Sequence, residues 1–267
     1  MRRTFSFPAL VLRVRPSGES NREALFLSAE EGVISATLFG GPKSRLRSQV
    51  SPFHSGTLWI YRDPARDFRK VSDFDVQSWR PGLRELYERS GAAFQMARAI
   101  LAGRGGGGDP GLAGKGAFAG ALSLAERSLD ALENAGEELC ERIGLHFLWN
   151  WAILLGSGPD PEHCGSCACG FDHDGVSWFV PGEGLLCKKC AFQERAAFSG
   201  AAFGGIGPPL GPEARRWLLA ARDAPPGELA GRGLDAASLG ELKVLVKHLG
   251  LGLEGGADYW RGNDESR

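Results

Sequence analysis

The first 80 residues alternate short apolar runs with polar or glycine-containing turns. β-branched and other apolar residues dominate each run, and turn residues such as those at positions 16–21 and 31–32 separate the runs. The runs cover residues 8–14, 24–28, 33–39, 56–61 and 69–76. This pattern predicts five short strands that close into a small barrel or sandwich over residues 1–80.

The periodicity changes from two to about 3.6 after Pro81, which indicates helices. Apolar residues recur at helical spacing over residues 83–101, 118–134 and 137–155, and again over 191–199, 213–221 and 238–249. We therefore expect an α+β protein of several domains. A helical domain would occupy residues 81–158 and 193–254, interrupted by a small insert at 159–192, and the polar tail 255–267 would be disordered.

Two Cys-x-x-Cys pairs in that insert are the strongest chemical signal. Nineteen residues separate Cys164 and Cys167 from Cys187 and Cys190. Four thiolates at this spacing favour one structural Zn²⁺ in a four-cysteine zinc ribbon. Other metal ligands are possible at the first pair. Cys169 forms a Cys-x-Cys pattern with Cys167, and two histidines are near enough to replace a cysteine ligand. These histidines are His163 and His173.

Known catalytic patterns do not occur in the chain, so we expect a protein that is not an enzyme. The His-x-Glu, His-Glu-x-x-His and Gly-x-Ser-x-Gly motifs are missing. The glycine-rich stretch at 103–116 does not fit a phosphate-binding loop, since Gly116 follows Lys115 where Ser or Thr is required. We interpret it as a flexible linker. Cys140 falls within a helix and is expected in its core.

The net charge of −1 hides an asymmetry between the two parts of the chain. Residues 1–80 hold 13 Lys and Arg against 8 Asp and Glu, whereas the remainder holds 18 against 24. A basic domain followed by an acidic one is common in nucleic-acid-binding proteins. The 24 arginines against 7 lysines suit phosphate recognition, but with 39 glycines they also suit a genome-wide residue bias.

The basic residues of the predicted barrel are the candidate DNA contacts. Lys43, Arg45 and Arg47 alternate, so an extended segment would place them on one face. The full candidate set is Arg13, Arg15, Lys43, Arg45, Arg47, Arg69 and Lys70. Four nearby aromatics either stack bases or fill the barrel core: Phe39, Phe53, Trp59 and Tyr61.

Nothing in the sequence indicates export or membrane insertion. Arg13 and Arg15 interrupt the apolar stretch 5–12, no small-residue cleavage site follows, and no segment approaches the ~20 apolar residues of a membrane span. We expect a cytoplasmic protein, in which thiols stay reduced and available for metal binding.

The order of these parts resembles the bacterial RecO family of recombination mediators. Gly-Gly-Pro-Lys-Ser-Arg at 40–45 follows the third strand, and Leu155, Gly156 and Pro161 precede the first cysteine pair. Gly-Glu-Gly-Leu-Leu-Cys at 182–187 leads into the second pair, and more helices follow. The resemblance spans nearly the whole chain and implies an N-terminal OB-fold followed by a helical domain that carries a zinc ribbon.

The resemblance also implies a function in recombinational repair without nucleotide hydrolysis. Such a protein binds single- and double-stranded DNA, anneals complementary strands and helps to load RecA onto strands coated by single-strand-binding protein. It would act at the nucleoid, with RecR and the acidic C-terminal tail of single-strand-binding protein as partners. Lys43, Arg45 and Arg47 fall in the family's basic loop region and the four cysteines in its metal positions.

A groove between the helices is the expected docking place for an acidic tail. Its candidate contacts are Arg127, Arg142, Arg215 and Arg216. The alternative function is a zinc-ribbon transcription or adaptor protein that binds protein partners only.

Overall fold

The structure is a computed structural model that describes residues 3–41, 44–103, 115–171, 175–197 and 207–251. The chain forms two compact units, Met1–Glu137 and Glu138–Arg267, which we describe separately. The predicted boundary at residue 80 lies inside the first unit, so the division of domains made from the sequence stays a prediction. The predicted linker is described only at Gly103, Lys115 and Gly116, and the tail 255–267 lies outside the described residues.

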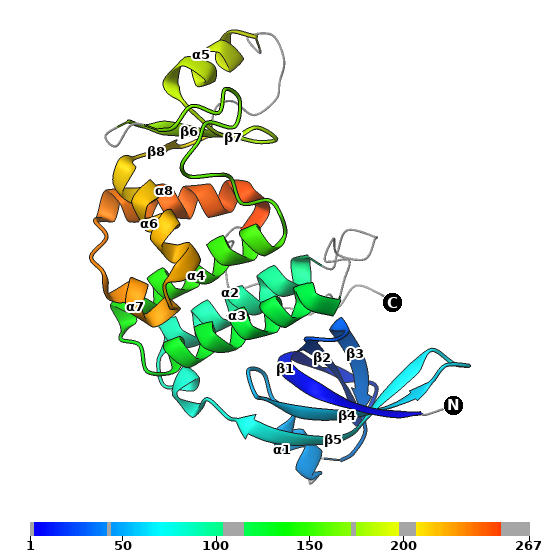
Figure 1. Ribbon diagram of the computed structural model, residues 1–267. Helices are drawn as coiled ribbons and strands as arrows, with labels where there is room; N and C mark the ends of the chain where they lie inside the picture. The colour runs from blue at the N-terminus through cyan, green and yellow to red at the C-terminus, as the bar shows by residue number, and fades with distance from the viewer. Residues whose placement is uncertain (1–2, 42–43, 104–114, 172–174, 198–206, 252–267) are drawn as a thin grey trace. The chain divides into compact units, whose positions relative to one another are not determined.

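Five strands of the first unit close into a barrel (Figure 1). They are β1 (Thr4–Ser17), β2 (Asn21–Ser28), β3 (Gly32–Leu38), β4 (Ser55–Asp63) and β5 (Phe68–Ser78). Their order is β1-β2-β3-β5-β4, and antiparallel pairing of β1 with β4 closes the ring, while β3 meets β5 in parallel at Thr37 and Lys70. The predicted five-stranded barrel is confirmed, and it is an OB-fold.

Alternation along each strand fills the barrel with apolar side chains. Leu58 and Ile60 of β4 and Val71 of β5 are fully buried, and the Phe26 and Phe74 rings meet edge to face with centroids 6.0 Å apart. Strands β4 and β5 leave no room for a side chain at Gly56, where a Cβ would lie only 2.0 Å from the Asp75 carbonyl oxygen. The barrel therefore requires glycine at position 56.

Arg80 connects the end of the barrel to the helices of the same unit. After Arg80, the 3₁₀ turn η1 (Pro81–Arg84) leads to α2 (Tyr87–Ala102), and α3 (Lys115–Glu133) follows. The Arg80 side chain is only 2% exposed and donates to the Phe53 carbonyl at 2.8 Å, the Ser55 hydroxyl at 3.0 Å and the Asp130 carboxylate of α3 at 2.6 Å. One guanidinium thus joins the start of β4 to a helix.

His54 occupies the same corner of the barrel, where both nitrogens of its imidazole have a polar neighbour. Its Nδ1 lies 2.8 Å from the Gln49 carbonyl oxygen, which can only accept, so Nδ1 carries the proton. Nε2 then faces the guanidinium of Arg84 at 3.4 Å. Burial lowers the pKa of His54, as do the charges of Arg84 and Arg80, and together they outweigh the hydrogen bond to Gln49, which raises it.

The second unit combines helices with a small sheet. The helices are α4 (Glu137–Leu154), α5 (Lys188–Ala197), α6 (Pro212–Asp223), α7 (Pro226–Gly231) and α8 (Ala236–Val246), which ends in the π-helical turn η2 (Lys247–Leu251). The strands are β6 (Ser177–Val180), β7 (Gly184–Leu186) and β8 (Pro209–Leu210), in the order β7-β6-β8. Figure 1 shows α5 on one side of this sheet and α6 and α8 on the other.

Helical periodicity predicted α2 to α6 and α8 to within a few residues at most ends. The sequence reading missed α7 and β8, which are short, and it was wrong about residues 45–49. These form a helical turn, α1 (Arg45–Gln49), in place of an extended segment. Across the described helices, none combines the length and apolar character needed to cross a membrane.

We expect Arg80→Met to lower the free energy of unfolding of the first unit by about 2–4 kcal/mol, because it leaves the buried Phe53 carbonyl without its donor. Native-state hydrogen exchange of the barrel amides in the full chain measures this. The control is Arg84→Met, whose exposed bond to Ser51 is worth less than about 1 kcal/mol. Equal effects of the two changes would contradict the role given to Arg80.

Candidate functional site

The four cysteines of the two Cys-x-x-Cys pairs come together at one point. The Sγ atoms of Cys164, Cys167, Cys187 and Cys190 all lie within 4.8 Å of one another. Cys164 and Cys190 are buried, whereas Cys167 is exposed. Four sulfur donors at such distances can surround a single ion and leave no open position, so the residues fit a closed structural metal site.

A tight turn forms the first half of the cluster. The Ala168 N–H donates to the Cys164 carbonyl at 2.8 Å, and Ala168 has a left-handed backbone with φ 55°. Gly165 lies directly against the other half, where a Cβ would come within 1.9 Å of the Glu183 carbonyl oxygen. Its own N–H donates to the Leu185 carbonyl at 2.8 Å. The glycine therefore lets the two cysteine pairs approach each other.

The second pair joins strand β7 to helix α5. The Cys187 N–H points at the Cys164 Sγ at 3.3 Å, and the Sγ atoms of Cys167 and Cys187 are 3.9 Å apart. Hydrogen bonds from the backbone N–H and the thiol of Cys169 lower the pKa of Cys167 to about 6. Cys167 is therefore largely thiolate at neutral pH, which is the form that binds metals.

The structure separates the four cysteines from the alternative ligands. Cys169 is exposed and interacts with Cys167 and Cys187, but it is not in the group of four. His163 is outside the group as well, and its Nδ1 is 3.1 Å from an Asp160 carboxylate oxygen. His173 lies outside the described residues. Cys140 is buried in α4, as predicted.

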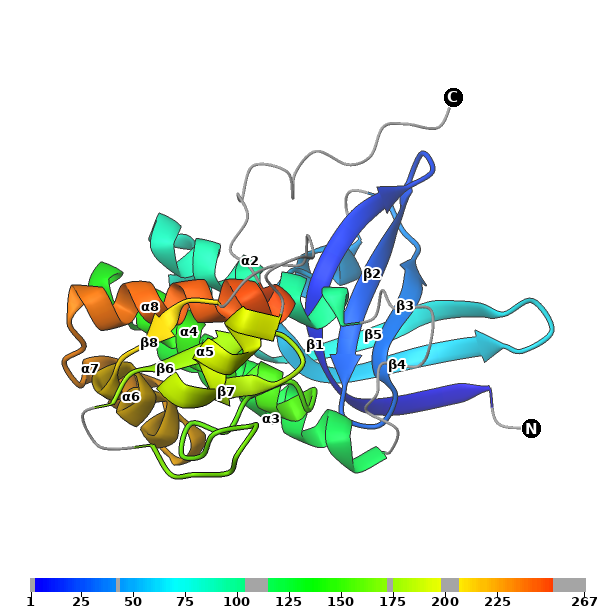
Figure 2. The ribbon, with the colours of Figure 1, turned by 90° about the horizontal axis from the view of Figure 1, so that it is seen from above.

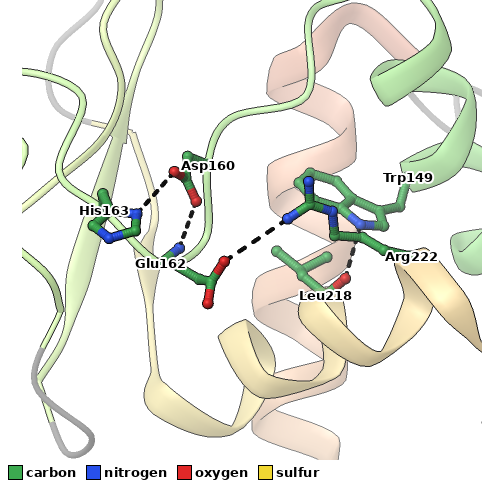
Figure 3. Close-up of polar contacts among 6 residues, drawn as sticks. All are labelled: Trp149, Asp160, Glu162, His163, Leu218 and Arg222. Carbon is green, nitrogen blue, oxygen red and sulfur yellow. Dashed lines mark hydrogen bonds and ion pairs between the residues drawn. The ribbon is translucent and has the colours of Figure 1, made fainter.

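Polar contacts attach the cysteine segment to the helices of the same unit (Figure 3). Asp160 accepts from the Glu162 N–H at 2.8 Å, and the Glu162 carboxylate lies 3.9 Å from Arg222 of α6. Beside them, the Trp149 indole of α4 donates to the Leu218 carbonyl of α6 at 3.0 Å. The loop that precedes the first cysteine is thus held on α6, and α6 on α4.

The predicted partner-binding arginines divide into internal and exposed ones. The prediction is wrong for Arg215, which is only 5% exposed, donates to the Gly175 carbonyl at 2.7 Å and lies 4.7 Å over the Phe171 ring. Arg142 donates to two carbonyls within its own unit, at 3.0 and 3.4 Å, so its contacts are structural as well. Arg127 and Arg216 are exposed, and for them a partner contact stays a prediction.

Arg13 and Arg15 lie on the same side of β1, with β2 beside them. Arg15 faces Glu23 of β2 in register, and their side chains pair at 2.5 Å. Burial by itself raises the pKa of Glu23, but the hydrogen bond from Ser35 and the pairing with Arg15 outweigh it, so the pKa is lowered. Glu23 stays ionised and offsets part of this basic surface.

The basic residues after β3 do not share a face as the sequence reading expected. In helix α1, positions 45 and 47 point in nearly opposite directions. Leu46 packs on the barrel core and Gln49 is buried, which explains why the segment coils. Arg45 is exposed and Arg47 half-buried, while Lys43 lies outside the described residues.

Further cations gather on the β4–β5 hairpin, which extends beyond the rest of the barrel (Figure 2). Arg62 and Arg69 are directly opposite in register, and burial followed by the charge of Arg69 lowers the pKa of Arg62. Arg62 pairs with Glu31 and lies 5.2 Å over the Phe5 ring. Lys70 is exposed beside Arg69, so both predicted contacts lie on this hairpin.

An open cleft of about 400 Å³ adjoins these cations, and we call it the aromatic cleft. It is lined by Phe39, Tyr61, Phe68, Lys70 and Ser72. Among the aromatics that the sequence suggested for base stacking, Phe39 and Tyr61 line it and Trp59 is half-buried outside it. Phe53 is only 5% exposed, so of the two alternatives it follows core packing. The sequence reading missed Phe68, although its two-residue spacing from Lys70 on a strand was a usable signal.

Comparison with known proteins agrees with this architecture. Residues 1–78 match the family model described as "Recombination protein O N terminal". The predicted resemblance to RecO is confirmed. The chain is 28% identical to the DNA repair protein RecO of Solidesulfovibrio magneticus over 263 residues, which cover 94% of this chain and 97% of that protein.

Two further relatives carry the same name. The DNA repair protein RecO of Pelotomaculum thermopropionicum is 31% identical over 161 residues, 60% of this chain and 58% of that protein. RecO of Syntrophomonas wolfei is 24% identical over 193 residues, 72% of each chain. The match to the RecO N-terminal family model covers the same residues as the barrel. The similarity to that family model therefore lies in the OB-fold barrel.

We expect purified protein to contain one metal ion per chain, and we expect Cys187→Ser to lose it, because three thiolates leave the coordination sphere open. Cys169→Ser is the matched control and should keep the metal. Elemental analysis of the three proteins measures this. Loss of the metal from Cys169→Ser would instead make Cys169 a ligand.

Proposed function

We propose that this protein acts in recombinational DNA repair as a DNA-binding mediator that is not an enzyme. The observation that carries the proposal is the closed OB-fold barrel of a RecO N-terminal domain, which presents exposed cations on its outer surface. The four relatives that match are each named DNA repair protein RecO.

Binding to DNA would depend mainly on phosphate contacts. Candidate contacts along the barrel are Arg13, Arg15, Lys43, Arg45, Arg47, Arg69 and Lys70. Each cation that neutralises a phosphate releases a condensed counterion, which favours binding at low salt. A surface that neutralises two complementary strands also lowers their mutual repulsion, and it would accept single- and double-stranded DNA and promote annealing.

The helices would provide contacts to proteins, while the barrel would bind DNA. We propose RecR and the acidic C-terminal tail of single-strand-binding protein as partners, and help in loading RecA as the outcome. Exposed Arg216 of α6 is a candidate contact for an acidic tail in the second unit, and exposed Arg127 of α3 is another in the first unit. Such work would take place in the cytoplasm, at the nucleoid.

Zn²⁺ is the metal that we propose for the four cysteines, since a tetrahedral set of four thiolates suits it. The ion would supply structure, holding the turn at Cys164–Cys167 to the start of α5. Gly165 and the left-handed Ala168 are already shaped for that contact. Loss of the ion should destabilise the second unit and leave DNA binding by the barrel intact.

We expect single-strand binding to weaken steeply with salt, and we expect Arg69→Ala with Lys70→Ala to weaken it further. Each lost phosphate contact should reduce the slope of log K against log salt by about 0.7. Fluorescence anisotropy over a salt series measures both effects. Lys243→Ala is the control, because this half-buried lysine of α8 pairs with Glu141 of α4, and both residues belong to the second unit. Salt-insensitive binding would favour a protein adaptor instead.

We expect the protein to accelerate annealing of complementary strands that were first coated with single-strand-binding protein. The variant that combines Arg69→Ala with Lys70→Ala should anneal them more slowly, because it binds phosphates less well. Lys243→Ala should match the wild type. Fluorescence quenching between labelled strands measures the rate. Wild-type protein that binds DNA but leaves this rate unchanged would remove annealing from the proposed function.

A further inference from the structure

The aromatic cleft has a feature that phosphate binding does not use, namely three large rings that stay outside the barrel core, one of them exposed. Phe39 is 40% exposed, and its ring meets that of Phe68 edge to face with centroids 6.0 Å apart. Tyr61 is half-buried beside them. Rings of this size normally enter the core of a small barrel, so their exposure requires an explanation.

Strand geometry explains how the rings are kept outside. Phe68, Lys70 and Ser72 alternate on the outer side of β5, while Val71 between them is fully buried. Tyr61 of β4 faces Lys70 in register on the same side. The inward positions are already filled by the barrel core, so the outer rings have no place inside it.

From this geometry we infer that the aromatic cleft binds one unpaired nucleobase of a single-stranded nucleic acid, with Lys70 beside the adjoining phosphate. The inference rests on the proposed DNA-binding function and adds to it a subsite that holds a base. A volume of about 400 Å³ falls at the small end of ligand sites. Aromatic faces next to cations are the usual means of holding bases from single strands.

The charges and polar groups of the cleft suit this ligand. Among the described residues that line it, none carries a carboxyl group, so nothing there repels a phosphate. The Lys70 ammonium lies 5.4 Å over the Phe39 ring, close enough to serve a phosphate next to a stacked base. The Tyr61 hydroxyl accepts from Arg3 at 3.2 Å, which adds a second cation at the rim.

A base in a duplex cannot use this site. Its faces are covered by neighbouring bases and its edge is paired, whereas a base in a single strand is free to leave the stack. The cleft would therefore add affinity for single strands, while the surrounding arginines attract either form of DNA. The barrel surface would thus have two parts. The cleft distinguishes single-stranded from double-stranded DNA, and the surrounding arginines do not.

The test measures binding of Phe39→Leu to a single-stranded oligonucleotide and to the same oligonucleotide with abasic positions. We expect roughly 5- to 100-fold weaker binding to the intact oligonucleotide. Binding to the abasic oligonucleotide and to a duplex should change little, and the salt slope should stay as in the wild type. Phe39→Trp, which keeps a stacking face, should restore binding.

The matched control is Trp79→Leu, since Trp79 is also exposed, at 48%, and follows the other end of β5. It should bind every DNA as the wild type does. Two results for Phe39→Leu would overturn the inference. One is normal binding to the intact oligonucleotide, and the other is an equal loss of binding to intact, abasic and duplex DNA. Wild-type protein that binds no DNA at low salt would instead overturn the proposed function.

Discussion

The first unit depends on the buried guanidinium of Arg80. It satisfies the Phe53 carbonyl and the Ser55 hydroxyl at the start of β4, and it pairs with Asp130 of α3. A buried charge is tolerated only when its donors are occupied, so these partners must stay in place. The barrel and α3 are consequently one structure, and the outer strands gain a rigid support for their exposed side chains.

The cysteine cluster constrains the second unit in turn. Here the constraint is the close contact of two backbone segments and not a buried charge. A side chain at Gly165 would collide with the Glu183 carbonyl, so only glycine lets the two pairs meet. Asp160 bonds within the preceding loop, and Glu162 brings that loop to Arg222 of α6. The four sulfurs have no open position among them, which separates the metal site from any chemistry on DNA.

We therefore assign the proposed DNA binding to the outer surface of the barrel. β4 and β5 send apolar residues inward, and the same alternation sends Tyr61, Phe68 and Lys70 outward. In the proposed function, cations there would attract any phosphate chain, and the rings of the aromatic cleft would supply contacts that only an unpaired base can use. The proposed selectivity for single strands thus arises from the strand register that also builds the core.

The sequence by itself determined the elements that depend on local pattern. Alternation predicted the five strands, helical spacing predicted α2 to α6 and α8, and paired cysteines predicted the cluster, because each signal needs only neighbouring residues. Long-range packing decided the rest. Leu46 had to reach the core, so the basic segment coiled into α1, and Phe53 and Arg215 were drawn inside. The aromatic cleft joins residues from β4, β5 and the end of β3, and only closure of the barrel brings these together.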